Sequence, residues 1–278
     1  MQYRLLLLVP IILLAGSVAI LSIHYGQTGQ WFERSIQLEG GTLITAETSV
    51  DYDLSQIDAL LSDSFGDVHT RELSGLSGYA LLIETETDVD PQEVVALLGN
   101  SGVEITDYSV ETIGSALGES FWAQAQFGII AAFVLMGIIV LAIFRTFVPS
   151  FAVILCAASD IIITLALMQV FGIELSLPTL AALLMLIGYS IDTDILLTTR
   201  LLKTREGNVS QRVRNTFKTG ATITGTTIGV LVAILVFNAS VVLSEIAAVL
   251  LIGLAVDMVN TWLQNAVLLR WYCERKGI

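Results

Sequence analysis

Five acidic residues lie inside long apolar stretches of this 278-residue chain, and their side chains are the best placed to do chemistry. They are Asp160, Asp192, Asp194, Glu245 and Asp257. A charged side chain inside lipid costs about 3 kcal/mol or more, so such residues face protein or water and are functional candidates. Carboxyl groups held among hydroxyls in a low dielectric bind protons tightly, as an ion relay requires. We therefore expect a relay of protons or sodium ions, or a set of interhelical hydrogen bonds.

Asp192 and Asp194 are two residues apart, which places their side chains roughly 200° apart around a helix. They cannot both face one partner. One is expected to point to the bundle interior or a subunit interface, and the other to a polar cavity or the inner water boundary. Asp192 is interpreted as the deeper relay candidate. For Asp194, with Arg200 close behind it, two interpretations stay open: a relay residue, or a solvated residue at the cytoplasmic boundary.

Asp257 begins a polar stripe along one helix face, with spacings of three and four residues. The stripe continues with Asn260, Thr261, Gln264 and Asn265. Such a stripe must face protein or water, either as interhelical hydrogen bonds of about 0.6 kcal/mol each or as part of an ion relay. Asp160, beside Ser159 and Thr164, allows the same two interpretations, and here interhelical hydrogen bonding is favoured.

Six apolar windows must position these residues. With 54% hydrophobic and only 14% charged residues, the composition is that of a protein in lipid. A bilayer core of about 30 Å needs about 20 helical residues. The windows run over residues 5–24, 121–144, 149–171, 177–199, 220–238 and 242–269. The first window is too long for a secretory signal and lacks a small-x-small cleavage site, so a retained helix is expected.

The basic residues predict how the helices are oriented. If six helices alternate across the membrane, 11 of the 13 lysines and arginines fall on one side, including a basic segment at about 200–218. Because positive charge in short loops stays inside, both termini are predicted to be cytoplasmic. Residues 1–27 then form the first helix, 28–119 an extracytoplasmic domain, and 120–278 helices two to six.

The segment 28–119 holds 18 of the 26 acidic residues and reads as a small α+β domain. Strands are predicted over 35–48, 68–73, 79–86 and 103–113. The first strand contains a break at Gly40-Gly41, where a bulge or close backbone approach is expected. Helices are predicted after Asp53 as far as Phe65, and after Asp90 with a proline in the first position. The order βαββαβ is that of a ferredoxin-like fold, with four antiparallel strands covered on one face by two helices.

Composition excludes several functions. A net charge of -13 repels nucleic acid and anionic surfaces, and the acidic excess suggests a high-salt environment. The two cysteines and two histidines are isolated, so no metal site is expected. No HExxH, P-loop or GxSxG motif occurs, so no cofactor and no enzymatic activity are expected.

Three short motifs carry a resemblance to a known family. They are Glu39-Gly40-Gly41-Thr42, Val110-Glu111-Thr112-Ile113-Gly114 with Gly118, and Ile187-Gly188-Tyr189-Ser190. Together with the order of one helix, an outer domain and five helices, they resemble the SecD/SecF family of the resistance-nodulation-division (RND) superfamily, in its smaller, SecF-type half. The resemblance covers nearly the whole chain. The double aspartate and acidic surface resemble archaeal, halophilic members.

The resemblance implies an accessory subunit of the Sec translocase in the cytoplasmic membrane. Its partners would be SecD, a SecY-type channel, the translocating polypeptide and membrane lipid, with coupling to the proton or sodium gradient. Many relatives carry Asn-Asp-Thr where this chain has Asp192-Thr193-Asp194, so the family pattern does not assign the relay aspartate. Relatives also place an arginine early in helix five, where an ungapped match puts Thr219 after Lys218. The basic partner of the relay therefore stays open.

Two other functions are alternatives to export. The first is an RND-type exporter of lipids or small amphiphiles, of which one six-helix bundle would be half. The second is an intramembrane aspartyl protease, in which Asp192 and Asp257 would share a proton. The protease is disfavoured because no glycine directly precedes Asp257 and Ile191, not tyrosine, precedes Asp192.

Overall fold

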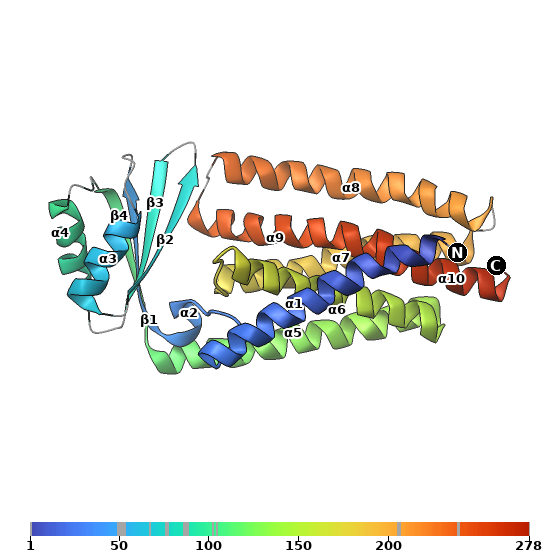
Figure 1. Ribbon diagram of the computed structural model, residues 1–278, viewed down its shortest axis with the longest axis horizontal. Helices are drawn as coiled ribbons and strands as arrows, with labels where there is room; N and C mark the ends of the chain where they lie inside the picture. The colour runs from blue at the N-terminus through green and yellow to red at the C-terminus, as the bar shows by residue number, and fades with distance from the viewer. Residues whose placement is uncertain are drawn as a thin grey trace.

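A bundle of long helices carries a small sheet domain at one end (Figure 1). The computed structural model describes residues 2–48, 54–66, 68–75, 78–85, 89–101, 103, 105–204, 207–237 and 240–277. The N- and C-terminal ends lie together at the end of the bundle opposite the sheet (Figure 1). This placement is the one expected for an even number of spans.

Six helices in the described part of the chain are long and apolar enough to cross a membrane, as the apolar windows predicted. The first is α1 (Leu8–Thr28), preceded by the 3₁₀ turn η1 (Gln2–Leu7). The next four are α5 (Ser115–Phe144), α6 (Phe147–Val170), α7 (Leu177–Lys203) and α8 (Val209–Phe237). The sixth span joins α9 (Val241–Asn260), the π-helical turn η2 (Thr261–Asn265) and α10 (Ala266–Lys276).

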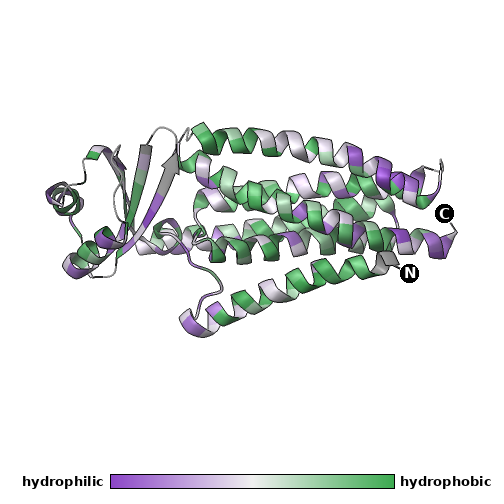
Figure 2. Ribbon diagram, turned by 45° about the horizontal axis from the view of Figure 1, so that its top comes forward, coloured by the Kyte–Doolittle hydropathy of each residue, from purple (hydrophilic) through white to green (hydrophobic). Residues whose placement is uncertain are grey.

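Helices α6, α7 and the α9 span form the centre of the bundle. Their apolar windows are 61%, 50% and 44% buried, whereas those of α1, α5 and α8 are each 17% buried. The outer helices therefore leave large apolar surfaces for lipid or a partner. Figure 2 shows apolar residues along most of the bundle and hydrophilic residues at the end of α8 near the termini.

The sheet domain contains four antiparallel strands in the order β2-β3-β1-β4. The strands are β1 (Gly41–Thr48), β2 (Val68–Gly75), β3 (Gly78–Thr85) and β4 (Ile105–Ile113). Helices α3 (Leu54–Phe65) and α4 (Pro91–Asn100) pack on one face around a core that includes Ile44, Leu61 and Leu98. The chain order is thus the predicted βαββαβ, and the sheet stands between these helices and the bundle (Figure 1).

The start of the first strand and the helix caps of the sheet domain were predicted with different success. The predicted strand 35–48 is wrong in its first part, because Ile36–Glu39 forms the short helix α2 before β1 begins. Residues 35–39 close a helical turn, with the Glu39 amide donating to the Ser35 carbonyl at 3.2 Å. Asp90 caps α4 as predicted, accepting from the Gln92 amide at 2.9 Å, whereas Asp53 lies outside the described residues.

The glycines of the first motif permit a close contact between the sheet domain and the bundle. A Cβ on Gly118 of α5 would lie 2.7 Å from the Gly40 amide nitrogen, and a Cβ on Gly40 would lie 2.6 Å from the Ser115 Cα. Gly40 also has a φ of 96°, which side chains disfavour. Only glycine therefore fits at these two positions, which explains the break in the first predicted strand.

Candidate functional site

Three aspartates meet in the centre of the bundle, one from each of its central helices. Asp160 of α6, Asp194 of α7 and Asp257 of α9 are at most 1% exposed. Within the described ranges, no lysine or arginine forms an ion pair with any of them. Neutral hydroxyl and amide groups are therefore their donors. We call Asp160, Asp194 and Asp257 the aspartate cluster.

Asp160 is held by two donors from neighbouring helices. The Ser190 hydroxyl on α7 donates to Oδ2 at 2.7 Å, and the Asn260 amide on α9 donates to Oδ1 at 2.7 Å. Both carboxyl oxygens of Asp160 are therefore bonded to neutral donors from other helices.

Thr261 links the other two aspartates. Its hydroxyl lies 3.0 Å from Asp194 Oδ1 and 3.1 Å from Asp257 Oδ1. The Asn265 amide donates to the same Asp194 oxygen at 2.7 Å. Both Thr261 and Asn265 belong to the π turn η2, a type of irregularity often found at functional sites. A path of polar groups thus runs from Asp257 through Thr261 to Asp194.

Carboxyl oxygens without hydrogen-bond donors limit how many of the three aspartates can be ionised at once. Asp194 Oδ2 and Asp257 Oδ2 are buried and accept no hydrogen bond from the described residues. Holding three ionised carboxylates together without a cation would be very costly in a low dielectric. The arrangement is therefore suited to carboxyl groups that take up and release protons.

The structure separates the two aspartates of helix α7. Asp194 is fully buried, so the interpretation that it is solvated at the cytoplasmic boundary is wrong. Asp192 is instead exposed on the outside of this chain. It therefore does not share a proton with the buried Asp257, the pair that the protease alternative required. The difference follows from the predicted angle between the two side chains, which left open which of them faces inward.

The residues predicted to support the relay also fall into a buried group and an exposed group. Asn260, Thr261 and Asn265 are fully buried and bond to the aspartate cluster. Lys218 and Thr219 are exposed on α8, and the Thr219 hydroxyl donates to the Asn215 carbonyl of its own helix at 3.4 Å. Among the residues that the structure describes, no basic group therefore reaches the aspartate cluster.

The motif residues have distinct places. In Gly188-Tyr189-Ser190, only Ser190 is buried and contacts the cluster, while Gly188 and Tyr189 are exposed on α7. Thr42 of the first motif contacts Thr112 of the second across strands β1 and β4, with 3.1 Å between the hydroxyl oxygens. The glycine motifs thus build the sheet and its contact with α5, and the helix motif reaches the cluster through its serine.

Sequence reasoning missed part of the site. It gave Ser190 only as a motif residue, and it did not identify Cys156, whose sulfur lies 3.9 Å from the Thr261 hydroxyl. Gln264, noted only in the stripe, donates to the Ser159 hydroxyl at 3.3 Å. Glu245 lies apart from the cluster and accepts from Ser176 at 3.1 Å near the sheet domain. Polar residues at helical spacing were the available signal, but the partners depend on helix packing.

Comparisons with known proteins agree with this architecture. A family model described as protein export membrane protein SecD/SecF, C-terminal, matches residues 92–275. The protein-export membrane protein SecF of Methanolacinia petrolearia is 42% identical, covering 96% of this chain and 93% of its own length. The corresponding proteins of Pyrococcus furiosus and Haloferax volcanii are 37% and 35% identical over 99% and 97% of this chain.

A solved structure shares the fold. The crystal structure of SecDF, a translocon-associated membrane protein from Thermus thermophilus, superposes with a TM-score of 0.77 at 23% identity. The alignment covers 98% of this chain but only 38% of the SecDF chain. By the family match and the near full-length identity to the SecF proteins, the chain belongs to the SecD/SecF family of protein-export membrane proteins.

Proposed function

We propose that this chain is an accessory subunit of the Sec translocase that assists protein export and is driven by an ion gradient. The observation that carries the coupling is the aspartate cluster: three fully buried carboxyl groups on three helices with neutral donors. Carboxyl groups in such a setting can change charge only by exchanging an ion. Family membership supplies the export role, and the cluster supplies a place where the gradient can act.

The polar path suggests how an ion would move. A proton on Asp257 can pass to Asp194 through the Thr261 hydroxyl, which contacts both carboxyl groups. A hydroxyl can accept one proton while donating another, as such a relay needs.

Exposed polar residues on α7 and α8 suggest that a partner subunit binds there. Asp192 on α7 and Lys218 and Thr219 on α8 are exposed in the chain alone, although ionisable groups inside spans face protein or water. A SecD-type subunit beside α7 and α8 would cover them and could supply the missing basic group. The SecDF chain, of which this chain matches 38%, is long enough to contain such a second half. A SecY-type channel would complete the assembly.

The sheet domain is assigned to the outside of the membrane. Its strand order and its βαββαβ chain order are those of a ferredoxin-like fold. The basic segment at about 200–218 lies at the opposite end, so the positive-inside rule places that end and both termini in the cytoplasm. The division into 1–27, 28–119 and 120–278 follows from this orientation. In that position the domain can contact emerging polypeptides or the partner's domain.

Two measurements test the proposal. Export of a secreted protein should slow in cells or vesicles that carry Asp257→Asn, while the variant stays in the membrane at normal level. Purification of tagged protein in mild detergent should bring down a subunit of similar topology. Normal gradient-dependent export by both Asp257→Asn and Asp194→Asn would refute the relay. A protein that purifies alone and moves lipids or small amphiphiles would refute the export role.

A further inference from the structure

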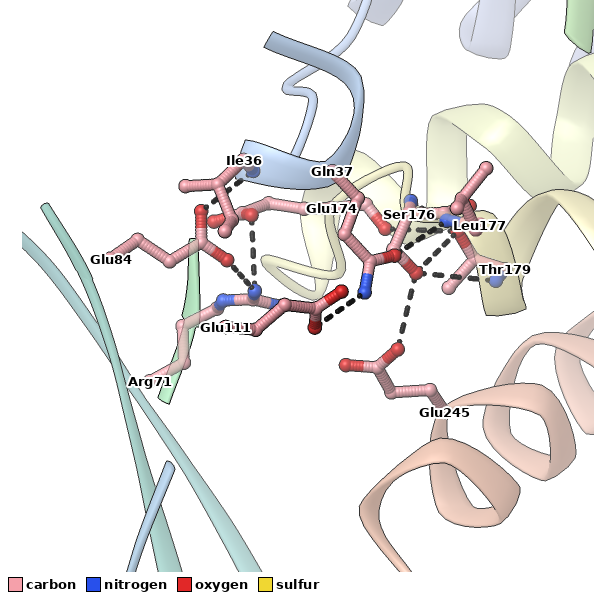
Figure 3. A network of polar contacts seen from close by, with 10 residues as sticks. All are labelled: Ile36, Gln37, Arg71, Glu84, Glu111, Glu174, Ser176, Leu177, Thr179 and Glu245. Atoms are coloured by element: carbon pink, nitrogen blue, oxygen red, sulfur yellow. Dashed lines mark hydrogen bonds and ion pairs between the residues drawn. The ribbon is translucent and has the colours of Figure 1, made fainter. Parts of the chain in front are cut away.

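A group of charged side chains joins the sheet domain to the bundle, far from the aspartate cluster (Figure 3). Arg71 of β2 is at its centre, with Nη2 2.5 Å from Glu84 Oε1 and 3.0 Å from Glu174 Oε2. Glu84 lies on the neighbouring strand β3, whereas Glu174 lies in the loop between α6 and α7. One guanidinium therefore bridges the two parts of the molecule. We call Arg71, Glu84, Glu174 and Glu245 of α9 the joint.

Backbone and side-chain bonds fix the α6–α7 loop to the chain that leads into the sheet domain. The Ser35 amide donates to the Leu175 carbonyl at 3.0 Å, and the Leu175 amide donates to the Glu33 carbonyl at 2.9 Å. The Ser176 hydroxyl donates to Glu245 Oε2 at 3.1 Å and also caps α7. The loop that carries Glu174 is thus continuous with the helix that carries Asp194.

The joint has more negative than positive charge. Arg71 acts on three carboxyl groups, and Glu84 and Glu174 are only 6% and 8% exposed. If all were ionised, three negative charges and one positive charge would be largely buried, which is unfavourable. Glu84 and Glu174 both contact the one Arg71 guanidinium, so a proton on Glu174 removes one of the negative charges gathered there. The closed joint therefore holds one proton more than separated side chains would.

Two cavities give water access to the joint. One of about 410 Å³ is lined by Glu84, Glu174 and His69, among others. A second of about 450 Å³ is lined by Arg71 and Glu245 together with apolar residues such as Phe171. Protons can therefore reach the joint from the side of the sheet domain without crossing the aspartate cluster.

We infer that the joint is a proton-controlled latch, closed on the bundle while the buried Glu174 carries a proton and opened when that proton leaves. Opening separates Arg71 and Glu84 on the sheet from Glu174 and Glu245 on the bundle. Each carboxylate is then hydrated and needs no proton. The charged and titratable groups that belong to or border the joint are Glu33, Arg34, Glu39, His69, Arg71, Glu84, Glu111, Glu174 and Glu245.

The pKa values of the joint support the latch and give the direction of its pH dependence. Burial, followed by repulsion from Glu84, raises the pKa of Glu174 to about 8 from an ordinary 4.5, although Arg71 acts in the opposite direction. Burial alone would lower the pKa of Arg71, but Glu174 and Glu84 outweigh it and the pKa is raised, so the arginine stays charged. The closed state binds more protons than the open one. Closure is therefore fully favoured below pH 4.5 and is lost as the pH rises through about 8.

The latch can be tested by measuring a distance in the full-length protein. Spin labels at Gln92→Cys on α4 and Val230→Cys on α8 occupy exposed positions, while the native cysteines are buried. Pulsed electron paramagnetic resonance in nanodiscs should give one short distance at pH 5. A longer distance should become the main population by pH 9. Because the readout is a distance, it does not depend on export or on the aspartate cluster.

Variants make the test specific. Glu174→Gln has the shape of the protonated side chain and should keep the short distance from pH 5 to 9. Glu47→Gln, an exposed carboxyl on β1, should follow the wild type. Arg71→Ala should give the long distance at every pH; if it does not accumulate, Glu174→Gln decides alone. A wild-type distance that does not change with pH, or a Glu174→Gln variant that keeps the wild-type transition, would overturn the latch.

Discussion

The aspartate cluster and the joint are both groups of buried carboxyl groups, but they are stabilised differently. In the cluster, the donors are Ser190, Thr261 and two asparagine amides, all neutral. In the joint, the main donor is the Arg71 guanidinium, and two cavities border the site. The cluster is enclosed by three helices, whereas the joint lies where two parts of the molecule meet.

The comparison shows how the surroundings determine what a carboxyl group can do. Without a nearby cation, a carboxyl group in the cluster is most stable when protonated, and its ionisation requires a change in its surroundings. In the joint, one arginine partly offsets three carboxyl groups, and in the proposed latch a single proton on Glu174 decides between the closed and open states. The cluster is therefore suited to carrying ions, and the joint to holding or releasing a domain.

The largest expected effect lies in the cluster. Asp257→Asn keeps the size of the side chain but cannot exchange a proton. It should reduce the gradient-dependent part of export roughly a hundredfold, as expected for loss of one proton-transferring group. Export measured in vesicles with and without an imposed gradient checks this. Asp63→Asn, an exposed change on α3, is the control and should leave export unchanged.

A smaller effect is expected where the sheet domain contacts α5. Gly118→Ala would place a Cβ 2.7 Å from the Gly40 amide nitrogen, so the backbone must shift at a cost of about 1–3 kcal/mol. Gly128→Ala on the same helix meets nothing within 4 Å. Thermal unfolding in detergent should show a lower midpoint for Gly118→Ala only. Equal midpoints would mean that the sheet domain is not held at this contact.

Removing the bridging hydroxyl tests whether the cluster also stabilises the bundle. Thr261→Val keeps the shape of the side chain but removes the one hydroxyl that lies between Asp194 and Asp257, for a loss of about 1–3 kcal/mol. Thr227→Val is the matched control, because that hydroxyl is exposed and donates only to its own helix. If the two variants unfold alike, the cluster contributes no stability and its bonds serve the relay alone.

The smallest expected effect is on stability, and it tests whether Asp192 acts within this chain or at a contact with a partner subunit. Asp192→Asn should change the stability of the isolated protein by less than about 0.5 kcal/mol, because the side chain is exposed. The same variant should weaken recovery of the SecD-type partner in pull-down experiments. Reduced stability of the isolated chain, with unchanged partner recovery, would show that Asp192 acts within this chain.

The sequence predicted the parts of the structure that depend on local pattern. Long apolar windows predicted all six spans, and capping and turn residues predicted the βαββαβ order. The failure at residues 35–39 has a local cause. Buried Ile36 and Leu38 alternate as in a strand, but the segment instead turns beside the bundle, where the Ser35 amide donates to the carbonyl of Leu175, far along the sequence.

The site could be predicted only in part. Helical spacing predicted that Asp192 and Asp194 face different ways, but which one is buried depends on the packing of α7 against α9. The bond between Asp160 and Asn260 joins residues 100 positions apart. The joint was not predicted at all, because Arg71, Glu84 and Glu174 are ordinary charged residues in sequence and come together only when the sheet domain meets the bundle.

The π turn η2 has a mechanical consequence for the sixth span. In an ordinary α-helix, residues four apart drift steadily around the axis, so Asp257, Thr261 and Asn265 would not stay in one column. A π turn winds more slowly and offsets this drift, which lets Thr261 and Asn265 both reach Asp194 of α7. If the turn tightened to α geometry, Asn265 would rotate away from Asp194 and α10 would swivel with it. The wider turn thus sets the rotation of α10 at which Asn265 reaches Asp194.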